Sequence, residues 1–440
     1  MDGVLLICVM ILTLAVQAIF SQRKMVIIFI GATVSVTLSV TVGHQTMKSI
    51  YANVPWEVLA ILIGLGIFSS LMAKSGLFDV LAVLASRVSR GSHLLIIIMF
   101  SSIMFFLSGI LNNLTALLLL LPVLISILNC LGTSQKFIAL CFSLIIVACN
   151  LGGASTPIGD FPAILLMGTG SIAFVKYLFI AFPICLLLFL VILLLSVPYY
   201  QMKTKMNIGK VESSIGLSVL RELYRNLRIK KSLLFAGLLT FLIMFSLWTF
   251  GSKIGISPDI VCFLGIGPLL LLYNSEGEDI IKNKVDFETI LFLACLFIMV
   301  SCMAGSGILN FIAISMSNYI RSPQMLIFML MIGTGISTSI FSAGPSMATM
   351  LPIAQQVILQ GGFPADVVLV GIALSVCAGS SLFLTAATAG PLSQNMIEKS
   401  KLTTQDGEMA KFDLMAYLRF GLVYFVIIQL VAVFFVLFNL

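Results

Sequence analysis

The feature that most constrains this chain is a series of apolar runs, most of them about 20 residues long, the length at which a helix crosses a bilayer. The runs lie near residues 4–20, 25–43, 54–73, 137–168, 173–198, 232–251, 256–273, 287–304, 366–398 and 415–439. Only 9% of the 440 residues are charged, whereas a soluble protein carries about 25%. We therefore expect an all-α polytopic membrane protein in contact with the lipid bilayer, in which the net charge of +7 does not indicate nucleic-acid binding.

Two further apolar stretches, 94–130 and 323–359, are interrupted in the middle by polar or helix-breaking residues. The interruptions read SGILNN from Ser108 and SAGPS from Ser342. Each stretch is long enough for a re-entrant helical hairpin or for two full spans, and the sequence leaves that choice open.

The two halves of the chain match each other. The sequence from Val54 aligns without a gap on that from Val285, an offset of 231 residues (285 − 54), and this places Gly76 on Gly307. The same order of elements follows each match, which predicts an internal duplication. The predicted units are a first transmembrane repeat 1–198, a basic linker 199–231 and a second repeat 232–440.

The distribution of basic residues predicts how the repeats are oriented. If the interrupted stretches are hairpins, each half crosses the membrane five times, and the second repeat is inverted relative to the first. All 24 Lys and Arg residues except Lys48, Lys176, Lys253 and Arg321 then fall on the cytoplasmic side. The positive-inside rule therefore favours about ten transmembrane helices, two hairpins and both termini outside.

Both repeats carry helix-breaking residues inside a predicted span. A broken helix frees N–H groups at one end and C=O groups at the other, and these bind substrates and ions at the midplane of secondary transporters. The alternative is that the glycines serve close helix packing, but paired breaks in two repeats favour a binding site. The residues are Gly152, Gly153, Pro157 and Gly159 in the first repeat, and Gly379, Gly390 and Pro391 in the second.

Asp160 is the acid beside the first break. An ionisable side chain inside a membrane is costly and indicates a functional site, here as a proton carrier, a sodium ligand or both. The alternative is a helix cap, and the two roles are compatible. Neutral oxygens complete the predicted ion-binding site: Asn112, Asn113 and Thr115 at the first hairpin tip, Asn150, Ser155 and Thr156 at the first break, Ser346 and Thr349 at the second tip, and Ser380, Ser381 and Thr388 at the second break.

The motifs LNNLT from Leu111 and NLGGASTPIGD from Asn150 resemble the ion transporter superfamily of arsenite/antimonite permeases, NhaD-type sodium/proton antiporters, the P-protein group and divalent-anion/sodium symporters. GGASTPIGDFP, SAGPSMATMLP and AGSSLFLTAATAGPL are most similar to its magnetosome members. The resemblance implies an ion permease of the bacterial inner membrane or a magnetosome membrane, and dimers are frequent in the superfamily. Asn112 and Ser346-Met347 depart from it, because antiporters often carry Asp and Asp-Asn there.

These observations predict a secondary transporter for a small inorganic ion, with proton-coupled cation antiport of the Na⁺/H⁺ type as the first hypothesis. The alternatives are an arsenite-type or other oxyanion or carboxylate permease, and a membrane scaffold that has lost transport. We expect no enzyme activity, catalytic residue, cofactor or metal site, because Walker, HExxH and CxxC patterns are absent from the sequence.

Overall fold

Helices are the regular elements of this protein in the computed structural model, and one isolated bridge pairs Thr403 with Met409 in the part of the chain that is described. The structure describes every residue except 1, 21, 22, 78, 79, 82, 83, 85–87, 90, 91, 204–228, 252, 253, 320, 321, 387, 388, 401 and 406. The predicted linker 199–231 therefore lies largely outside the described residues.

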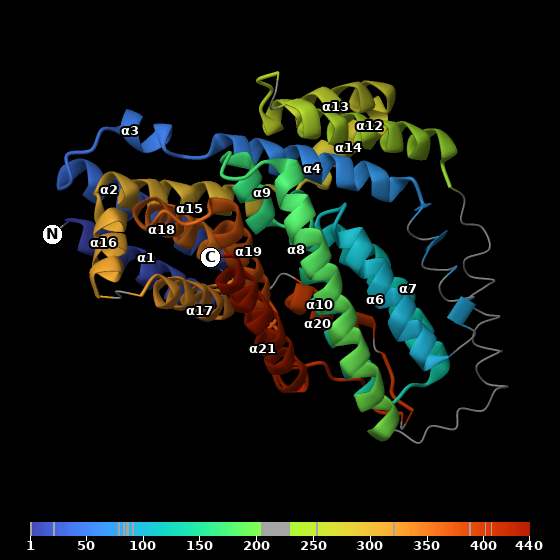
Figure 1. The fold of residues 1–440 in the computed structure, drawn as a ribbon. Coiled ribbons are helices and arrows are strands. Elements are labelled where there is room, and N and C mark those ends of the chain that lie inside the picture. Colours follow the sequence, from blue (N-terminus) through green and yellow to red (C-terminus); the bar gives the residue numbers. More distant parts are fainter. Residues whose placement is uncertain are drawn as a thin grey trace.

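Most of the long helices fall in the apolar runs of the sequence, and Figure 1 shows how the helices are arranged. The first half contains α1 (Asp2–Ile19), α2 (Lys24–Thr41), α3 (Met47–Ala52), α4 (Trp56–Lys74), α6 (His93–Ser108), α7 (Asn113–Leu131), α8 (Gln135–Ser155), α9 (Phe161–Gly168) and α10 (Phe174–Lys203). The second half contains α12 (Lys231–Phe250), α13 (Pro258–Leu272), α14 (Asn274–Asn283), α15 (Phe287–Gly305), α16 (Ile308–Tyr319), α17 (Pro323–Phe341), α18 (Ala343–Gly361), α19 (Ala365–Ser380), α20 (Ala389–Ser400) and α21 (Leu414–Asn439).

Nine helices of the described chain are long and apolar enough to cross a membrane: α2, α4, α7, α8, α10, α12, α15, α17 and α21. Shorter apolar helices are α1, α6, α13 and α19. Large apolar side chains such as Phe179 and Leu271 are 76% and 84% exposed, which suits a surface covered by lipid tails. The prediction of an all-α polytopic membrane protein is confirmed.

Helix α8 lies at the centre of the molecule. Every residue from Phe137 to Ser155 is buried, and the helix packs against α6, α7, α10, α19 and α21. Both interrupted stretches fold as helix pairs, α6 with α7 and α17 with α18; Figure 1 shows α6 and α7 side by side. The first pair is joined by residues 109–112 and the second by Ser342 alone.

Local structure repeats at the offset seen in the sequence. Gly76 and Gly307 both have φ +74°, a conformation that favours glycine. Ser75 and Ser306 precede them as helix C-caps, and each hydroxyl oxygen accepts a hydrogen bond from the backbone N–H two residues on. These matches support the interpretation of an internal duplication.

Packing between the halves is reciprocal. The first-half helix α2 packs on α15, and the corresponding second-half helix α13 packs on α4. Within each half the broken span packs between its partners, α8 between α6 and α10, and α19 between α17 and α21. The same set of contacts therefore occurs twice, as two repeats related by an approximate two-fold axis would require.

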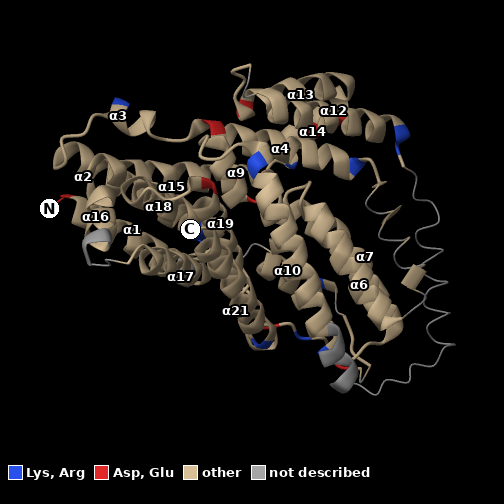
Figure 2. Ribbon diagram, viewed as in Figure 1, with Lys and Arg blue, Asp and Glu red and all other residues tan. Residues whose placement is uncertain are grey.

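Charged residues gather mainly at helix ends (Figure 2). Among the described residues, ion pairs join distant segments at Lys24–Glu288 (3.5 Å), Lys74–Asp279 (2.7 Å), Lys230–Glu276 (3.4 Å) and Lys176–Asp366. The partners of the three lysines that we assign to the cytoplasm all fall in residues 276–288. Hydrogen bonds from Lys74 and Asn283 hold the pKa of Asp279 below its usual range. The ion pairs agree with the sidedness predicted from the basic residues.

Two glycines bring helix backbones into contact. A Cβ atom on Gly152 of α8 would lie 2.1 Å from the carbonyl oxygen of Phe105 in α6. A Cβ atom on Gly379 of α19 would lie 2.3 Å from the carbonyl oxygen of Gly335 in α17. Small residues at such crossings allow the close approach that stabilises helix pairs in membranes. Gly152 and Gly379 therefore serve close helix packing, which is the alternative role considered for the glycines in the sequence.

We expect Gly152→Ala and Gly379→Ala each to destabilise the protein by about 1–3 kcal/mol or more, because the added methyl group forces two backbones apart. Thermal unfolding of the purified protein in detergent measures the loss. Gly333→Ala in α17 is the control, since its Cβ would have nothing within 4 Å. An equal loss in all three variants would contradict the packing argument.

Candidate functional site

The first break separates α8 from α9 at residues 156–160. Pro157 ends α8 because it has no N–H to donate and because it forces the preceding residue out of the helical conformation. Thr156 is accordingly extended (φ −127°, ψ 155°). Pro157 and Gly159 lie in the break as predicted, whereas Gly152 and Gly153 stay within the last turn of α8. The break therefore begins later along the chain than the glycine pair suggests.

Asp160 is the N-cap of α9. Its Oδ1 accepts a hydrogen bond from the Phe161 N–H at 2.8 Å, and the Asn113 side chain lies within hydrogen-bonding reach of its carboxylate. A Cβ on Gly153 would lie 2.8 Å from the Asp160 Cβ and 2.7 Å from the Asn113 Oδ1, so glycine makes room for both. The N-terminal ends of α7 and α9 and the C-terminal end of α8 thus meet at a half-buried carboxylate, and the two N-terminal ends favour its negative charge.

Hydrogen bonds tie the first break to the tip of the first helix pair. The Ser108 hydroxyl donates to the Cys149 carbonyl at 2.7 Å and is also hydrogen-bonded to the side chain of Asn113. The Thr156 hydroxyl donates to the Gly109 carbonyl. Asn113 is buried and Thr156 is half-buried. Of the polar groups predicted at the first tip and the first break, Asn113 and Thr156 are therefore brought together beside Asp160, along with Ser108.

The second break lies between α19 and α20, and its described part is residues 381–386. Gly379 is inside α19, while Gly390 and Pro391 are in the first turn of α20. A Cβ on Gly390 would lie 1.7 Å from the Leu384 carbonyl oxygen, so glycine lets α20 begin directly against the break. Thr388 lies outside the described residues.

Asn150, within the last two turns of α8, joins that helix to the second break. Its Nδ2 donates to the Ser381 Oγ at 3.1 Å and to the Ser380 carbonyl at 3.3 Å. All three residues are buried. Asn150 and Ser381 are 231 residues apart, which is the repeat offset, so equivalent positions of the two halves touch each other.

Several predicted ligands bond within their own helix instead. The hydroxyls of Ser155, Thr349, Ser380 and Ser381 donate to the carbonyls of Gly152, Pro345, Val376 and Cys377, at 2.6, 2.8, 2.9 and 2.9 Å. The Ser346 Oγ lies 3.2 Å from the Ser337 Oγ across the second helix pair. The hydroxyl hydrogens of Ser155, Thr349, Ser380 and Ser381 are therefore used within their own helices, although the lone pairs of these oxygens remain available to accept hydrogen bonds.

Asn112 and Thr115, the two remaining residues of the first tip, differ in their hydrogen bonds. The Asn112 side chain caps α7 by accepting a hydrogen bond from the Leu114 N–H at 2.9 Å. The half-buried Thr115 hydroxyl makes no hydrogen bond to any residue that the structure describes. Thr115, one turn from Asn112, therefore offers an uncommitted hydroxyl beside the cluster.

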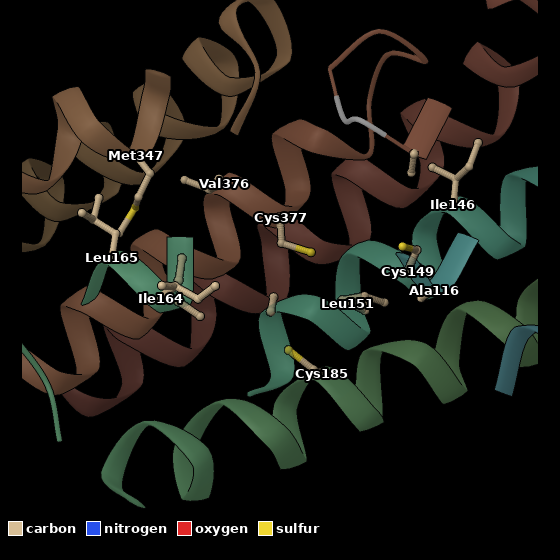
Figure 3. Close-up of a cluster of buried hydrophobic side chains, with 14 of the residues drawn as sticks. Ala116, Ile146, Cys149, Leu151, Ile164, Leu165, Cys185, Met347, Val376 and Cys377 are labelled. Carbon is tan, nitrogen blue, oxygen red and sulfur yellow. The ribbon is translucent and has the colours of Figure 1, made fainter. Parts of the chain in front are cut away.

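Three residues that bond to this region were not predicted from the sequence: Ser108, Tyr177 and Tyr417. The tyrosine hydroxyls donate to the Ala154 and Ser381 carbonyls at 2.8 and 2.9 Å. A signal did exist, because a Tyr-Leu pair occurs just after each broken span, at Tyr177 and at Tyr417. Behind the site, Cys149, Cys185 and Cys377 lie in one buried cluster with Leu151 (Figure 3). Within the described residues, no group of three His, Cys, Asp or Glu side chains is placed to hold a metal ion.

Comparison with known sequences gives one family. The chain matches the family described as citrate transporter over residues 11–318 and 250–439. Magnetosome protein MamN of Magnetospirillum gryphiswaldense is 28% identical over 431 residues, which cover 96% of each chain. The human P protein is 25% identical over 82% of this chain and 52% of its own length.

Comparison with solved structures gives the same architecture. MtrF of Neisseria gonorrhoeae, which is described as illuminating a class of antimetabolite efflux pumps, superposes with a TM-score of 0.58 at 14% identity; the match covers 90% of this chain and 83% of MtrF. At that identity the likeness shows the fold. The predicted resemblance to the ion transporter superfamily, including its magnetosome and P-protein members, is confirmed.

We expect Asp160→Asn to be more stable than Asp160→Ala by about 0.5–2 kcal/mol, because asparagine keeps an oxygen that can accept the Phe161 N–H and alanine does not. Thermal unfolding of both purified variants measures the difference. Equal stability of the two variants would show that the cap contributes nothing.

Proposed function

Since this chain belongs to the citrate transporter family, we propose that it is a secondary active transporter that exchanges protons for a small cation, such as Na⁺, across the bacterial inner membrane or a magnetosome membrane. The observation that carries this proposal is Asp160, a half-buried carboxylate at a helix break where three helix ends meet. The similarity of the chain to MamN supports a location in a magnetosome membrane.

One carboxylate can couple the two ions because it binds either of them. The deprotonated Asp160 attracts a cation, and neutral oxygens such as the Thr156 hydroxyl can complete the coordination. The protonated Asp160 side chain is neutral and releases the cation. Since a proton and a cation then compete for one site, each can be carried only when the other has left. An acid inside a transporter commonly serves as such a relay.

The charge around the site supports a cation over a carboxylate substrate. Among residues 92–175 the basic side chains are His93 and Lys136, each within the first two residues of its helix, and residues 322–398 contain none. A carboxylate substrate is commonly held by Arg or Lys side chains or by a helix N-terminus, and the N-terminal ends of α7 and α9 already meet the Asp160 carboxylate. The hydroxyls of Ser155 and Ser380 donate within their own helices, which leaves fewer hydroxyl donors for a neutral solute such as arsenite.

The architecture that we propose for this transport is two inverted repeats, 1–198 and 232–440, joined by the basic linker 199–231. The reciprocal packing of α2 on α15 and of α13 on α4 supports it. In such a transporter one bundle rocks against the other around a fixed midplane site. The two breaks, which meet through Asn150 and Ser381, would be that site.

The test uses everted membrane vesicles and a pH-sensitive dye, with Na⁺, Li⁺ and K⁺ added in turn. We expect cation-dependent proton movement in the wild type and a loss of at least about tenfold in Asp160→Asn, because asparagine cannot bind and release a proton. Asp413→Asn is the matched control: Asp413 also caps a helix, α21, by accepting from the Ala416 N–H at 2.8 Å, but it is exposed. This variant should keep wild-type exchange.

Other outcomes assign other functions. A wild type that responds to no cation but takes up labelled citrate or arsenite would replace the proposal with a carboxylate or oxyanion permease. A wild type that moves none of these, with Asp160→Asn showing no phenotype in cells, would favour a membrane scaffold.

A further inference from the structure

Two buried tyrosines occupy equivalent places in the two halves. Tyr177 is the fourth residue of α10, the helix that comes after the broken span α8–α9, and Tyr417 is the fourth residue of α21, which comes after the broken span α19–α20. Their exposed fractions are 1% and 0%. Leucine follows each of them, at Leu178 and Leu418. The two tyrosines therefore occur at equivalent positions of a unit found in both halves, which consists of a broken span and the long helix after it.

Each tyrosine bonds the carbonyl that its break leaves without a partner. The Tyr177 hydroxyl donates to the Ala154 carbonyl at 2.8 Å, one residue before α8 ends. The Tyr417 hydroxyl donates to the Ser381 carbonyl at 2.9 Å, at the C-cap of α19. In a continuous helix these carbonyls would accept from the N–H groups of Ile158 and Thr385, four residues on. The breaks remove those donors, and a phenol hydroxyl takes the place of each.

We propose that Tyr177 and Tyr417 are paired positioning residues, each of which fixes the carbonyl end of a broken helix in the orientation that binds the transported ion. A carbonyl oxygen has two lone pairs, so the one that accepts from tyrosine can still face an ion. The partial negative charge at a helix C-terminus suits a cation. The proposal deepens the proposed function and rests on it for the identity of that ion.

The bonds around Ser381 connect both tyrosines to one structure. The Ser381 carbonyl accepts from Tyr417, and its hydroxyl oxygen accepts from Asn150. Asn150 lies one turn before Ala154, the residue held by Tyr177, in the same helix. Tyr177 of α10 thus holds the end of α8, and Tyr417 of α21 holds the end of α19. Asn150 joins these two helix ends to each other.

Tyr424 provides a matched control in the same helix as Tyr417. It is 2% exposed, and its hydroxyl lies 3.4 Å from the Ser196 Oγ of α10 rather than at a break. Tyr424→Phe therefore removes the same atom from the same kind of surroundings without touching a broken-helix carbonyl. It reports the effect of losing any buried phenol hydroxyl.

The experiment compares Tyr177→Phe, Tyr417→Phe, the double variant and Tyr424→Phe in the vesicle assay. We expect each break variant to raise the half-saturating cation concentration about tenfold, as loss of a buried carbonyl's partner implies, with a smaller change in maximal rate. Tyr424→Phe should leave both values unchanged. Hydrogen exchange of the purified protein should become faster at residues 156–160 in Tyr177→Phe and at 381–386 in Tyr417→Phe.

Three results would overturn the proposal: unchanged half-saturation in both break variants, an equal rise in Tyr424→Phe, or faster exchange across the whole protein instead of at the matching break. Failure of the proposed function is distinguishable from these. If the wild type carries labelled citrate or arsenite instead of cations, the proposed function fails. Faster hydrogen exchange at the matching break in Tyr177→Phe and Tyr417→Phe would then still show that the tyrosines position these carbonyls, and unchanged exchange would show that they do not.

Discussion

A helix broken inside a membrane must have its freed backbone groups satisfied by protein, because lipid offers no hydrogen bonds. In this molecule side chains from other helices and from helix ends meet that requirement. The Asp160 carboxylate accepts from the N–H of Phe161, and the Tyr177 hydroxyl donates to a carbonyl at the end of α8. The burial of α8, the glycine contacts and the order of packing all follow from keeping two such breaks away from lipid.

The same requirement explains why the site is near the centre of the fold. Helix α8 is enclosed by other helices on all sides, and Gly152 lets α6 approach it closely. A polar cluster can persist there because nearly every member has a protein partner. Asp160 stands out from the cluster as its charged member, and the Phe161 N–H holds its carboxylate in a fixed position.

Much of the fold could be predicted from the sequence because hydrophobic length and proline act locally. The apolar runs give the helices, and Pro157 ends α8 wherever that helix packs. The glycines were harder to interpret, since Gly152 and Gly379 look like breaks but remain helical; glycine serves close contact as readily as chain reversal, and only the neighbour decides. Tyr177 and Tyr417 escaped prediction because each acts on a carbonyl from a distant part of the chain. Asp160 was identifiable as a charge in an apolar run, but its ion-binding role and the bound ion stay predictions.

The contact between Asn150 and Ser381 has a consequence for how such a protein could arise. A residue on the two-fold axis of a homodimer meets its own copy, so it has to be a donor and an acceptor at once, as an amide or a hydroxyl is. Once two copies are fused in one gene, the two positions can mutate separately. An asparagine facing a serine at positions one repeat offset apart is what such separate mutation would produce, and one side of the axis could then acquire an acid while the other does without.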